Sequence, residues 1–388
     1  MWIRRLRLAQ FRNHADTDLQ LTSGVNVIVG PNGAGKTALL EAVSVVCDGQ
    51  SFRSSHESAL MRDGARAGRV CATIDRNARE IEVGIGLGEY PNRYMLNGAP
   101  RSSSREVIGQ GRCVAFSPDD LELVKGGPSL RRKYLDDTLV GLAPRHYTER
   151  SEWERVLKQR NSLLKSLRSV RGPTPAALDT WTHLAAEKGA ALTAARIELV
   201  DRIRDPIQRV GDDLGLPPVE IGYASDWVGN TDAGCVAGIG PESDLVAGLE
   251  ARLLSAYSDV ADRERERAVS LAGPHLDDLH IRVEARDSRT RASQGEQRAL
   301  ALCLRIARLE MIEMALGEPP VLLLDDVFSE LDPERRRFLV EQLPDSQTLV
   351  TATALAGASG PPAELADVVL NSSGDLSVIR VEAGKVMQ

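Results

Sequence analysis

The sequence predicts an α/β fold interrupted by a mainly helical insertion, and three features of the chain lead to this interpretation. Residues 1–118 alternate apolar and polar positions in short runs, as half-buried strands do. Residues 119–270 change to long runs with apolar positions at helical spacing. Strand patterns return in residues 271–388. We therefore expect one α/β domain formed by the two ends of the chain, with the helical lobe inserted between them.

The expected strands are short and separated by turn residues. In the first part of the chain they have the sequences IRRLRLAQF, DLQLT, VNVIVG, RVCATIDR, REIEVGIGLG and YMLNG, and the helical sequence ALLEAVSVV follows Gly35. In the last part they have the sequences DDLHIRVEA, VLLLDD, QTLVTAT and SVIRVEAGKV. The run VLLL is apolar at every position, which indicates a parallel strand buried on both faces.

The insertion contains two long amphipathic stretches on either side of the helix-breaking sequence RGPTP. Two helices of about 25 to 35 residues would form a hairpin about 40–50 Å long. A third stretch, ARLLSAYSDVADRERERA, alternates acidic residues with Arg, which is typical of a solvent-exposed helix face. The residues expected at the contact between the two hairpin helices are Trp153, Val156, Leu157, Leu163, Leu164, Leu167, Leu178, Trp181, Leu184, Leu192, Leu199, Ile203 and Ile207.

Composition makes several kinds of protein improbable. No apolar run approaches the ~20 residues that span a bilayer, and Arg interrupts the N-terminal stretch, unlike a signal peptide. The six histidines show no metal-ligand spacing, and the net charge of −7 argues weakly against a nucleic-acid partner, although local basic patches count for more than the total. Five cysteines without paired spacing favour reduced thiols in a cytoplasmic protein. They are Cys47, Cys71, Cys113, Cys235 and Cys303.

A glycine-rich loop between a predicted strand and a predicted helix matches the P-loop, which binds a nucleoside triphosphate such as ATP. The glycines allow backbone N–H groups to face the phosphates, and the helix N-terminus adds its dipole. Lys36 is expected to bridge the β- and γ-phosphates, and Thr37 to hold Mg²⁺. The predicted nucleotide-binding residues are Gly30, Pro31, Asn32, Gly33, Ala34, Gly35, Lys36 and Thr37.

Two carboxylates follow directly after the buried strand VLLL. We expect Asp325 to bind the Mg²⁺ or its water, and Asp326 to orient or deprotonate the attacking water. A pair of acids after an apolar strand is common by itself, but in a chain that also carries a P-loop it indicates the catalytic half of a nucleotide-hydrolysing site.

A second anion site is predicted in the sequence SQGEQ, where Ser293 is a good N-cap for a helix that runs to about Met314. With VLLLDD after it and SELD beyond that, this set resembles the ABC-type ATPases. In those proteins, LSGGQ-like signature residues close on ATP held by another subunit. The residues that match the signature are Ser293, Gln294, Gly295, Glu296 and Gln297, and those that match the D-loop are Ser329 and Asp332.

The resemblance explains why one chain would carry two phosphate sites. In a two-fold dimer, each chain would bind ATP with its own P-loop and cap the ATP of its partner with its signature residues. About 255 residues separate the two motifs. This is more than transporter ATPases have, and far less than the very long coiled coil of SMC proteins would need.

Shorter motifs resemble the RecF family of bacterial DNA-repair ATPases, in order from residue 1 to about residue 355. They are FRNH, SFR, NG, FSPDDLELVKGGPSLRRKYLD, GPHLDDL, ASQGEQRALAL, LLLDDVFSELD and VTAT. The resemblance implies an ABC/SMC-type head that dimerises on ATP and binds DNA at gaps and single-strand/double-strand junctions. It further implies weak, DNA-stimulated ATP hydrolysis, work with RecR and RecO in loading a recombinase, and roles in replication restart and SOS induction.

The chain departs from these patterns at several positions. Asp326 replaces the Glu of most ABC ATPases, which predicts slow hydrolysis, and Thr351 and Thr353 stand where transporter-type heads carry a switch His. Leu276 stands where the family is expected to have Arg. The basic cluster at residues 131–133 matches the family, and the sequence leaves open whether it contacts a partner subunit, a domain interface or DNA.

An ATP-gated DNA clamp needs basic residues on the surface that meets the DNA phosphates, and its affinity should fall steeply with salt. The candidate DNA-binding residues are Arg53, Arg62, Arg66, Arg69, Arg101, Arg105 and Arg112. The alternative function is a P-loop kinase that phosphorylates a small acceptor. It accounts for Lys36, Thr37 and Asp325 but gives no role to SQGEQ or SELD.

Overall fold

A computed structural model describes residues 1–387 except 54–55, 91–92, 169–175, 230–241, 344–345 and 354–374. The chain divides into two compact units. Unit 1 consists of Met1–Asp120 and Leu302–Gln388, and unit 2 consists of Leu121–Ala301. The first boundary lies close to the expected 118/119. The second was expected at 270/271 but falls at 301/302.

The shift of the second boundary has a simple topological cause. Strand β10 (Asp278–Val283) pairs antiparallel with β9 (Val219–Ala224) and with β11 (Arg286–Asp287). These three strands form a small sheet within unit 2, and the short helix α7 (Ser288–Arg291) packs beside it. The strand-like sequence after residue 271 therefore completes the inserted lobe instead of returning the chain to the α/β domain.

Unit 1 contains a mainly parallel six-stranded sheet with the order β15-β14-β3-β13-β12-β8. Only β15 is antiparallel to its neighbour, β14. The P-loop strand and the strand before the two acids lie on either side of β13, so their C-terminal ends are close to one another. The strands are β3 (Val25–Gly30), β8 (Cys113–Phe116), β12 (Val321–Leu324), β13 (Thr348–Thr353), β14 (Leu376–Glu382) and β15 (Lys385–Met387).

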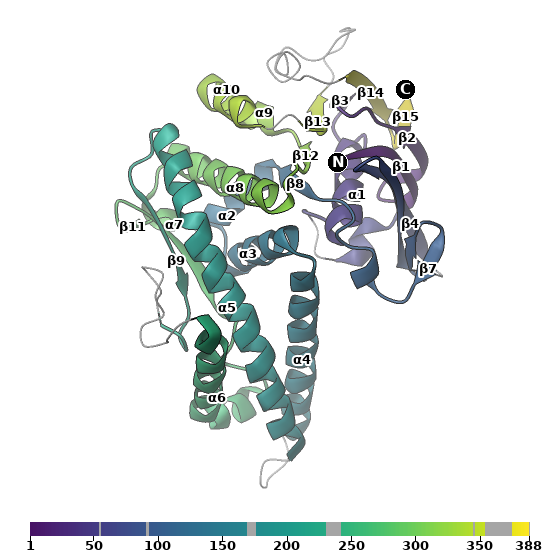
Figure 1. Cartoon of the computed structure of the whole chain (residues 1–388). Coiled ribbons are helices and arrows are strands. Elements are labelled where there is room, and N and C mark those ends of the chain that lie inside the picture. Colours follow the sequence, from purple (N-terminus) through teal and green to yellow (C-terminus); the bar gives the residue numbers. More distant parts are fainter. Residues whose placement is uncertain are drawn as a thin grey trace. The chain divides into compact units, whose positions relative to one another are not determined.

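A second six-stranded sheet in unit 1 is antiparallel, with the order β2-β1-β4-β5-β6-β7. Helix α1 (Lys36–Asp48) packs against strands of both sheets, and its apolar residues belong to one continuous core with theirs (Figure 1). The strands are β1 (Trp2–Phe11), β2 (His14–Gln20), β4 (Ala67–Arg76), β5 (Arg79–Gly88), β6 (Tyr94–Leu96) and β7 (Ala99–Arg101).

The remaining helices of unit 1 are short. They are the 3₁₀ helices Glu57–Leu60, Ser104–Glu106 and Pro118–Asp120, and the α-helices α9 (Val327–Glu330) and α10 (Pro333–Gln342). Helix α8 (Gln294–Leu316) starts in unit 2 and continues into unit 1. Among the described residues, no helix is long and apolar enough to cross a membrane.

Unit 2 confirms the expected hairpin, with α4 (Arg145–Leu167) and α5 (Ala176–Asp213) packed side by side (Figure 1). Trp153, Val156 and Leu192 are buried in its core. The unit also contains α2 (Leu121–Lys125) and α3 (Pro128–Leu142).

The third stretch, expected to be a solvent-exposed helix face, forms α6 (Glu242–Arg267) and packs against α5. Leu253 and Tyr257 of α6 join the hairpin core. In the charged part of the helix, Glu264 is only 1% exposed, and its buried carboxylate is compensated by an ion pair with Arg160. The expectation of a solvated face was therefore wrong for this side of α6.

Candidate functional site

The P-loop connects the end of β3 to the start of α1, and two of its glycines have positive φ angles. Gly33 has φ 78° and Gly35 has φ 113°. A Cβ on Gly35 would lie 2.7 Å from both the Asn13 Oδ1 and the His14 Nε2. Glycine is therefore required at position 35 both by backbone conformation and by the close approach of the β1–β2 turn.

The two ends of the chain hold this loop in place. Asn13 donates from Nδ2 to the Ala34 carbonyl at 2.9 Å, and the backbone N–H of Gly384, in the β14–β15 turn, donates to the same carbonyl at 2.8 Å. The His14 Nε2 lies 3.1 Å from the Gly35 carbonyl. In the sequence, FRNH is recognisable only as a family motif, and the structure shows that its Asn and His contact the backbone of the phosphate loop.

Burial lowers the pKa of His14 and so favours the neutral ring, although hydrogen bonds with the backbone of Gly35 and Gly384 act in the opposite direction. A carbonyl can only accept a hydrogen bond, so Nε2 carries the proton. Nδ1 must then accept from the Thr17 hydroxyl, which lies 3.0 Å away. The Gly35 carbonyl and the Thr17 hydroxyl thus favour the tautomer that carries its proton on Nε2.

Lys36 and Thr37 occupy the first turn of α1, beside the two acids. The Lys36 ammonium donates to the carbonyls of Gly30, at 2.7 Å, and Pro31, at 3.2 Å. Burial lowers the pKa of Lys36, while the charges of the two aspartates oppose that shift. The Thr37 hydroxyl donates to the Asp325 Oδ1 at 2.8 Å. The structure thus brings the predicted P-loop residues and the predicted acid into direct contact.

Asp325 and Asp326 follow the end of β12, and each contacts Thr351 through a different group. Asp325 is 7% exposed, and its Oδ1 also accepts from the Thr351 hydroxyl at 3.0 Å. Burial raises its pKa, although the hydrogen bonds from Thr37 and Thr351 act in the opposite direction. Asp326 adopts φ 53°, in the left-handed region, and its N–H donates to the Thr351 Oγ1 at 2.8 Å. From the sequence, Thr351 was expected only to replace a switch His, and these contacts were not predicted.

These residues surround a cavity of about 1020 Å³ in unit 1, which is of the size and polarity that a nucleotide needs. Arg12 and Arg53 also line it, and neither was predicted to be there. Arg12 donates to both carboxylate oxygens of Glu41, at 2.9 and 2.5 Å. Glu41 also accepts from the Ser51 hydroxyl at 2.6 Å, so one buried carboxylate connects the FRNH and SFR segments to α1.

The oxygen atoms at this cavity fit Mg²⁺. Thr37 and Asp325 offer a hydroxyl and a carboxylate, both hard oxygen ligands, and Asp326 lines the same wall. Among the described residues there is no cluster of three or more His, Cys, Asp or Glu that could hold a metal. Such a sparse set suits Mg²⁺, which binds one or two protein oxygens together with phosphate oxygens and water.

The signature residues lie in unit 2 and form a capping box at the start of α8. The Ser293 Oγ accepts from the Glu296 N–H at 3.2 Å, and the Ser293 N–H donates to the Glu296 Oε2 at 2.6 Å. This hydrogen bond lowers the pKa of Glu296. Because the Ser293 oxygen accepts, its proton remains available for an anion. Gln294 is exposed and Gly295 half-buried.

Gln297 differs from the rest of the signature, because its side chain is buried. Its amide donates to the carbonyls of Ser288, at 3.1 Å, and Arg289, at 3.3 Å. In the D-loop, Ser329 donates to the Asp326 carbonyl at 2.8 Å, and Asp332 caps α10 by accepting from the Arg335 N–H. All three side chains therefore shape the local backbone in this conformation.

The seven arginines proposed for DNA all lie in unit 1, and one of them is buried. Arg53 and Arg62 are exposed and line the phosphate cavity. Arg112 is 4% exposed and donates to the Gly111 carbonyl, and burial lowers its pKa. As a buried side chain, Arg112 cannot contact DNA in this conformation, so we withdraw it from the candidates.

The other four arginines are at least partly exposed. Arg66 and Arg105 are exposed. Arg69 donates to the Tyr90 hydroxyl at 3.2 Å and lies 5.5 Å from the centre of that ring, and Arg101 lies 3.8 Å from a glutamate carboxylate. These four, together with Arg53 and Arg62, remain candidates for contacts with phosphates.

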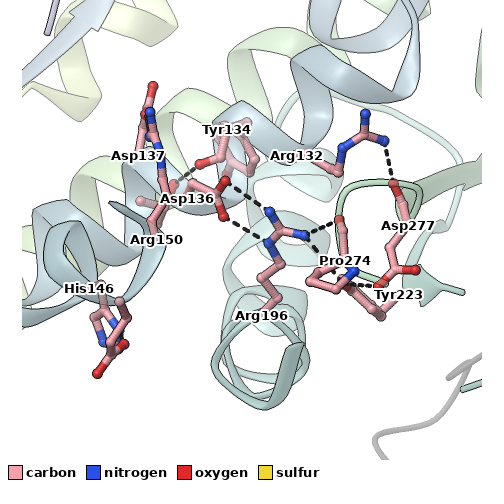
Figure 2. A network of polar contacts seen from close by, with 12 residues as sticks. Arg132, Tyr134, Asp136, Asp137, His146, Arg150, Arg196, Tyr223, Pro274 and Asp277 are labelled. Atoms are coloured by element: carbon pink, nitrogen blue, oxygen red, sulfur yellow. Dashed lines mark hydrogen bonds and ion pairs between the residues drawn. The ribbon is translucent and has the colours of Figure 1, made fainter. Parts of the chain in front are cut away.

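The basic cluster at residues 131–133 makes contacts inside unit 2. Arg131 donates to both oxygens of Asp278 at 2.8 Å, and Lys133 lies 2.6 Å from a carboxylate oxygen of Asp137. Figure 2 shows the third member, Arg132, donating to the backbone carbonyl of Asp277 at 2.6 Å. The three basic side chains therefore form hydrogen bonds and ion pairs with other residues of unit 2.

A mainly parallel sheet in which the P-loop strand β3 and the strand before the two acids, β12, lie on either side of β13 defines an ABC/SMC-type P-loop ATPase head. A family model described as "RecF/RecN/SMC N terminal domain" matches residues 2–356. The chain belongs to the RecF family.

Three relatives carry the name "DNA replication and repair protein RecF". That of Beutenbergia cavernae is 40% identical over 98% of this chain and 100% of its own length. Those of Arthrobacter sp. (strain FB24) and Pseudarthrobacter chlorophenolicus are each 38% identical over 91% of this chain and 93% of their own.

Two solved structures share the whole fold at 29% identity. One, described as the recombination mediator protein RecF-ATP in the RecFOR pathway, has a TM-score of 0.85 and covers 100% of this chain and 97% of its own. The other, described as RecF-ATPrS in the same pathway, has a TM-score of 0.83, with 99% and 97% covered.

Proposed function

We propose that this chain is an ATP-dependent DNA-binding protein of recombinational repair, in which shared ATP closes a two-fold dimer. The observation that carries this proposal is the phosphate cavity, where Lys36, Thr37 and Asp325 converge. The RecF-ATP structure supports ATP as the nucleotide, and the relatives named for DNA replication and repair support DNA as the partner. The kinase alternative is less favoured, because it gives no role to the capped Ser293.

The chain's own residues suit a binding and hydrolysis site. Lys36 would exchange its two backbone carbonyl partners for β- and γ-phosphate oxygens. Thr37 and Asp325 would hold Mg²⁺, which supplies neutralisation of phosphate charge. Asp326 would orient or deprotonate the attacking water. Its carboxylate is one carbon shorter than that of Glu, which predicts slow turnover of the kind that suits a switch.

Dimer closure would depend on the signature. The exposed Ser293 would donate its free hydroxyl proton to the γ-phosphate held by the partner subunit. Shifting an open dimer from 1:99 to 99:1 closed needs about 5.5 kcal/mol of differential binding, which two interfacial triphosphates could supply. Hydrolysis would remove the γ-phosphate contact and reopen the dimer.

In the closed form, DNA gaps and single-strand/double-strand junctions would stimulate the ATPase. They would meet the exposed or partly exposed candidates Arg53, Arg62, Arg66, Arg69, Arg101 and Arg105. Because these contacts are with phosphates, affinity should fall steeply with salt and depend little on sequence. RecR, with RecO acting through it, is the expected protein partner in the cytoplasm. The RecFOR pathway printed for the solved neighbours supports that assignment.

The experiment that tests this function is sedimentation of Asp326→Asn protein with and without ATP–Mg²⁺. This variant should bind ATP but not hydrolyse it, so the closed dimer should accumulate. A monomer that becomes a dimer only with ATP, and then binds gapped DNA more tightly, is the expected result. A protein that binds ATP but stays monomeric with and without DNA would reject the shared-nucleotide dimer and favour the kinase.

A further inference from the structure

We infer that Thr351 is a positioning residue for ATP hydrolysis, because its single hydroxyl fixes both members of the Asp325–Asp326 pair. This inference rests on the proposed function, since it concerns how the chain's own site is held ready for the reaction. It adds a residue on β13 to a site otherwise built from the P-loop and the strand before the two acids.

The position of Thr351 follows from strand order. β13 lies between the P-loop strand β3 and the acid strand β12, and in the parallel register Val350 is opposite Leu324. The next residue of each strand is then Thr351 and Asp325. Thr351 is only 2% exposed, so its hydroxyl must find partners within the protein.

The hydroxyl has two partners, and chemistry assigns the direction of each hydrogen bond. The Asp326 backbone N–H can only donate, so the Thr351 Oγ1 accepts it at 2.8 Å. The one hydroxyl proton is then free to be donated to the Asp325 Oδ1 at 3.0 Å. One side chain therefore holds the carboxylate of the first acid and the backbone of the second.

The second contact matters because the chain leaves the sheet at this point. Asp325 still donates its N–H to the Phe116 carbonyl of β8, at 2.9 Å. Asp326 instead turns into the left-handed region, with φ 53° and ψ 23°, which is costly for a residue other than glycine. Thr351 supplies the partner that its N–H would otherwise lack, and so stabilises the turn that directs Asp326 toward the cavity wall.

Two substitutions separate the hydroxyl from the shape of the side chain. Thr351→Val keeps the volume and branching but removes both hydrogen bonds, while Thr351→Ser keeps the hydroxyl. For Thr351→Val we expect kcat for ATP hydrolysis to fall about 10- to 100-fold, as a displaced catalytic group does, with ATP affinity within about threefold. Thr351→Ser should stay within about threefold of the wild-type kcat.

A readout independent of activity is hydrogen exchange of the Asp326 amide in nucleotide-free protein. Exchange should be faster in Thr351→Val and unchanged in Thr351→Ser. The matched control is Thr348→Val, which removes a buried hydroxyl from the other end of β13, where it donates to the Ser346 carbonyl at 3.3 Å. This control should keep the wild-type kcat and exchange rate.

The outcomes distinguish this inference from the proposed function. Wild-type protein that neither binds nor hydrolyses ATP would remove the proposed function itself. If the wild type hydrolyses ATP, a Thr351→Val variant with wild-type kcat overturns the inference alone. A loss in Thr351→Ser as large as in Thr351→Val would also overturn it, because side-chain shape would then be responsible. If Thr351→Val does not fold, Thr351→Ser provides the test. A large loss of kcat, or faster exchange of the Asp326 amide, in Thr351→Ser would then overturn the inference.

Discussion

Thr37 and Asp325 are 288 positions apart in the chain, and a hydrogen bond of 2.8 Å joins the hydroxyl of one to the carboxylate of the other. This contact connects the first turn of α1 to the end of β12. It exists because β3, which leads into the P-loop and α1, and β12 end at the same edge of a parallel sheet, on either side of β13. We propose that these two oxygens would serve together as ligands of Mg²⁺.

Asp325→Asn should leave the fold intact but weaken Mg²⁺-dependent ATP binding at least about tenfold. The Asn amide oxygen can accept from Thr37 and Thr351 as the carboxylate does, so we expect no loss of thermal stability. ATP titrations with and without Mg²⁺ measure the effect. Asp326→Asn is the control, since it should keep Mg²⁺-dependent binding and lose hydrolysis. Equal Mg²⁺ dependence in wild type and Asp325→Asn would exclude Asp325 as a metal ligand.

Lys36→Met should weaken ATP binding about 10- to 100-fold, since hydrogen bonds from a charged donor contribute about 1.5–3 kcal/mol. The Met side chain keeps much of the apolar length, so the loop conformation should survive. Isothermal titration with ATP measures the change. Lys385→Met makes the same substitution at an exposed position of unit 1 and should bind normally. Unchanged affinity in Lys36→Met would reject the P-loop assignment.

Ser293→Asp should abolish ATP-driven dimerisation while each subunit still binds ATP. Asp is as good an N-cap as Ser, so α8 should keep its start, but its charge would repel the triphosphate of the partner. Sedimentation with ATP–Mg²⁺ in an Asp326→Asn background measures this. Ser258→Asp, at an exposed serine of α6 in the same unit, should dimerise normally. Dimers that persist in Ser293→Asp would show that the signature assignment is incorrect.

The sequence was sufficient to predict those elements whose structure is decided by the residues of a single segment. The alternation in β1 and β4, the apolar run of β12 and the helical spacing of α4 and α5 each reflect a periodicity that burial imposes on one segment. The P-loop was equally readable, because its glycines and Lys36 lie within eight consecutive residues. Motifs of this kind can be recognised from sequence because all of their residues are close together in the chain.

The sequence was insufficient where distant segments meet. Glu264 belongs to an alternating charged run, and nothing near it in the chain reveals its partner Arg160. The pairing of β10 with β9 moved a domain boundary for the same reason. Around the site, Gly384 and Thr351 act through contacts made only in the folded chain. Their roles could be found only after the sheet order was known.

Glu264→Gln should destabilise unit 2 by about 3–5 kcal/mol, because it leaves the cation of Arg160 buried without its counter-ion. The pair is bidentate, at 2.6 and 3.1 Å, and the guanidinium lies 4.1 Å from the centre of the Tyr257 ring. Chemical denaturation measures the loss. Glu266→Gln, at an exposed position of the same helix, should change stability by no more than about 0.5 kcal/mol. A small effect in Glu264→Gln would show that water reaches Arg160.

The raised pKa of Asp277 predicts that unit 2 loses stability as pH rises from about 4 to about 6. Figure 2 shows its carboxylate accepting from the Tyr223 hydroxyl, at 2.6 Å, near the buried Arg196. It also accepts from the Trp227 indole at 3.1 Å. Burial nevertheless dominates and raises the pKa of Asp277 to about 6, while the hydrogen bonds and the charge of Arg196 act in the opposite direction.

A carboxyl group whose pKa is higher in the folded protein than in the unfolded chain stabilises the fold when it is protonated. That stability is complete below the unfolded value of about 3.9 and is lost as pH rises through about 6, a change of up to about 3 kcal/mol. Asp277→Asn should therefore flatten the dependence of unfolding free energy on pH between pH 4 and pH 7, as followed by tryptophan fluorescence in urea. Asp226→Asn, which removes an exposed carboxylate from the turn after β9, is the control and should keep the wild-type slope. Parallel curves for wild type and Asp277→Asn would mean that the carboxylate is solvated in the folded lobe.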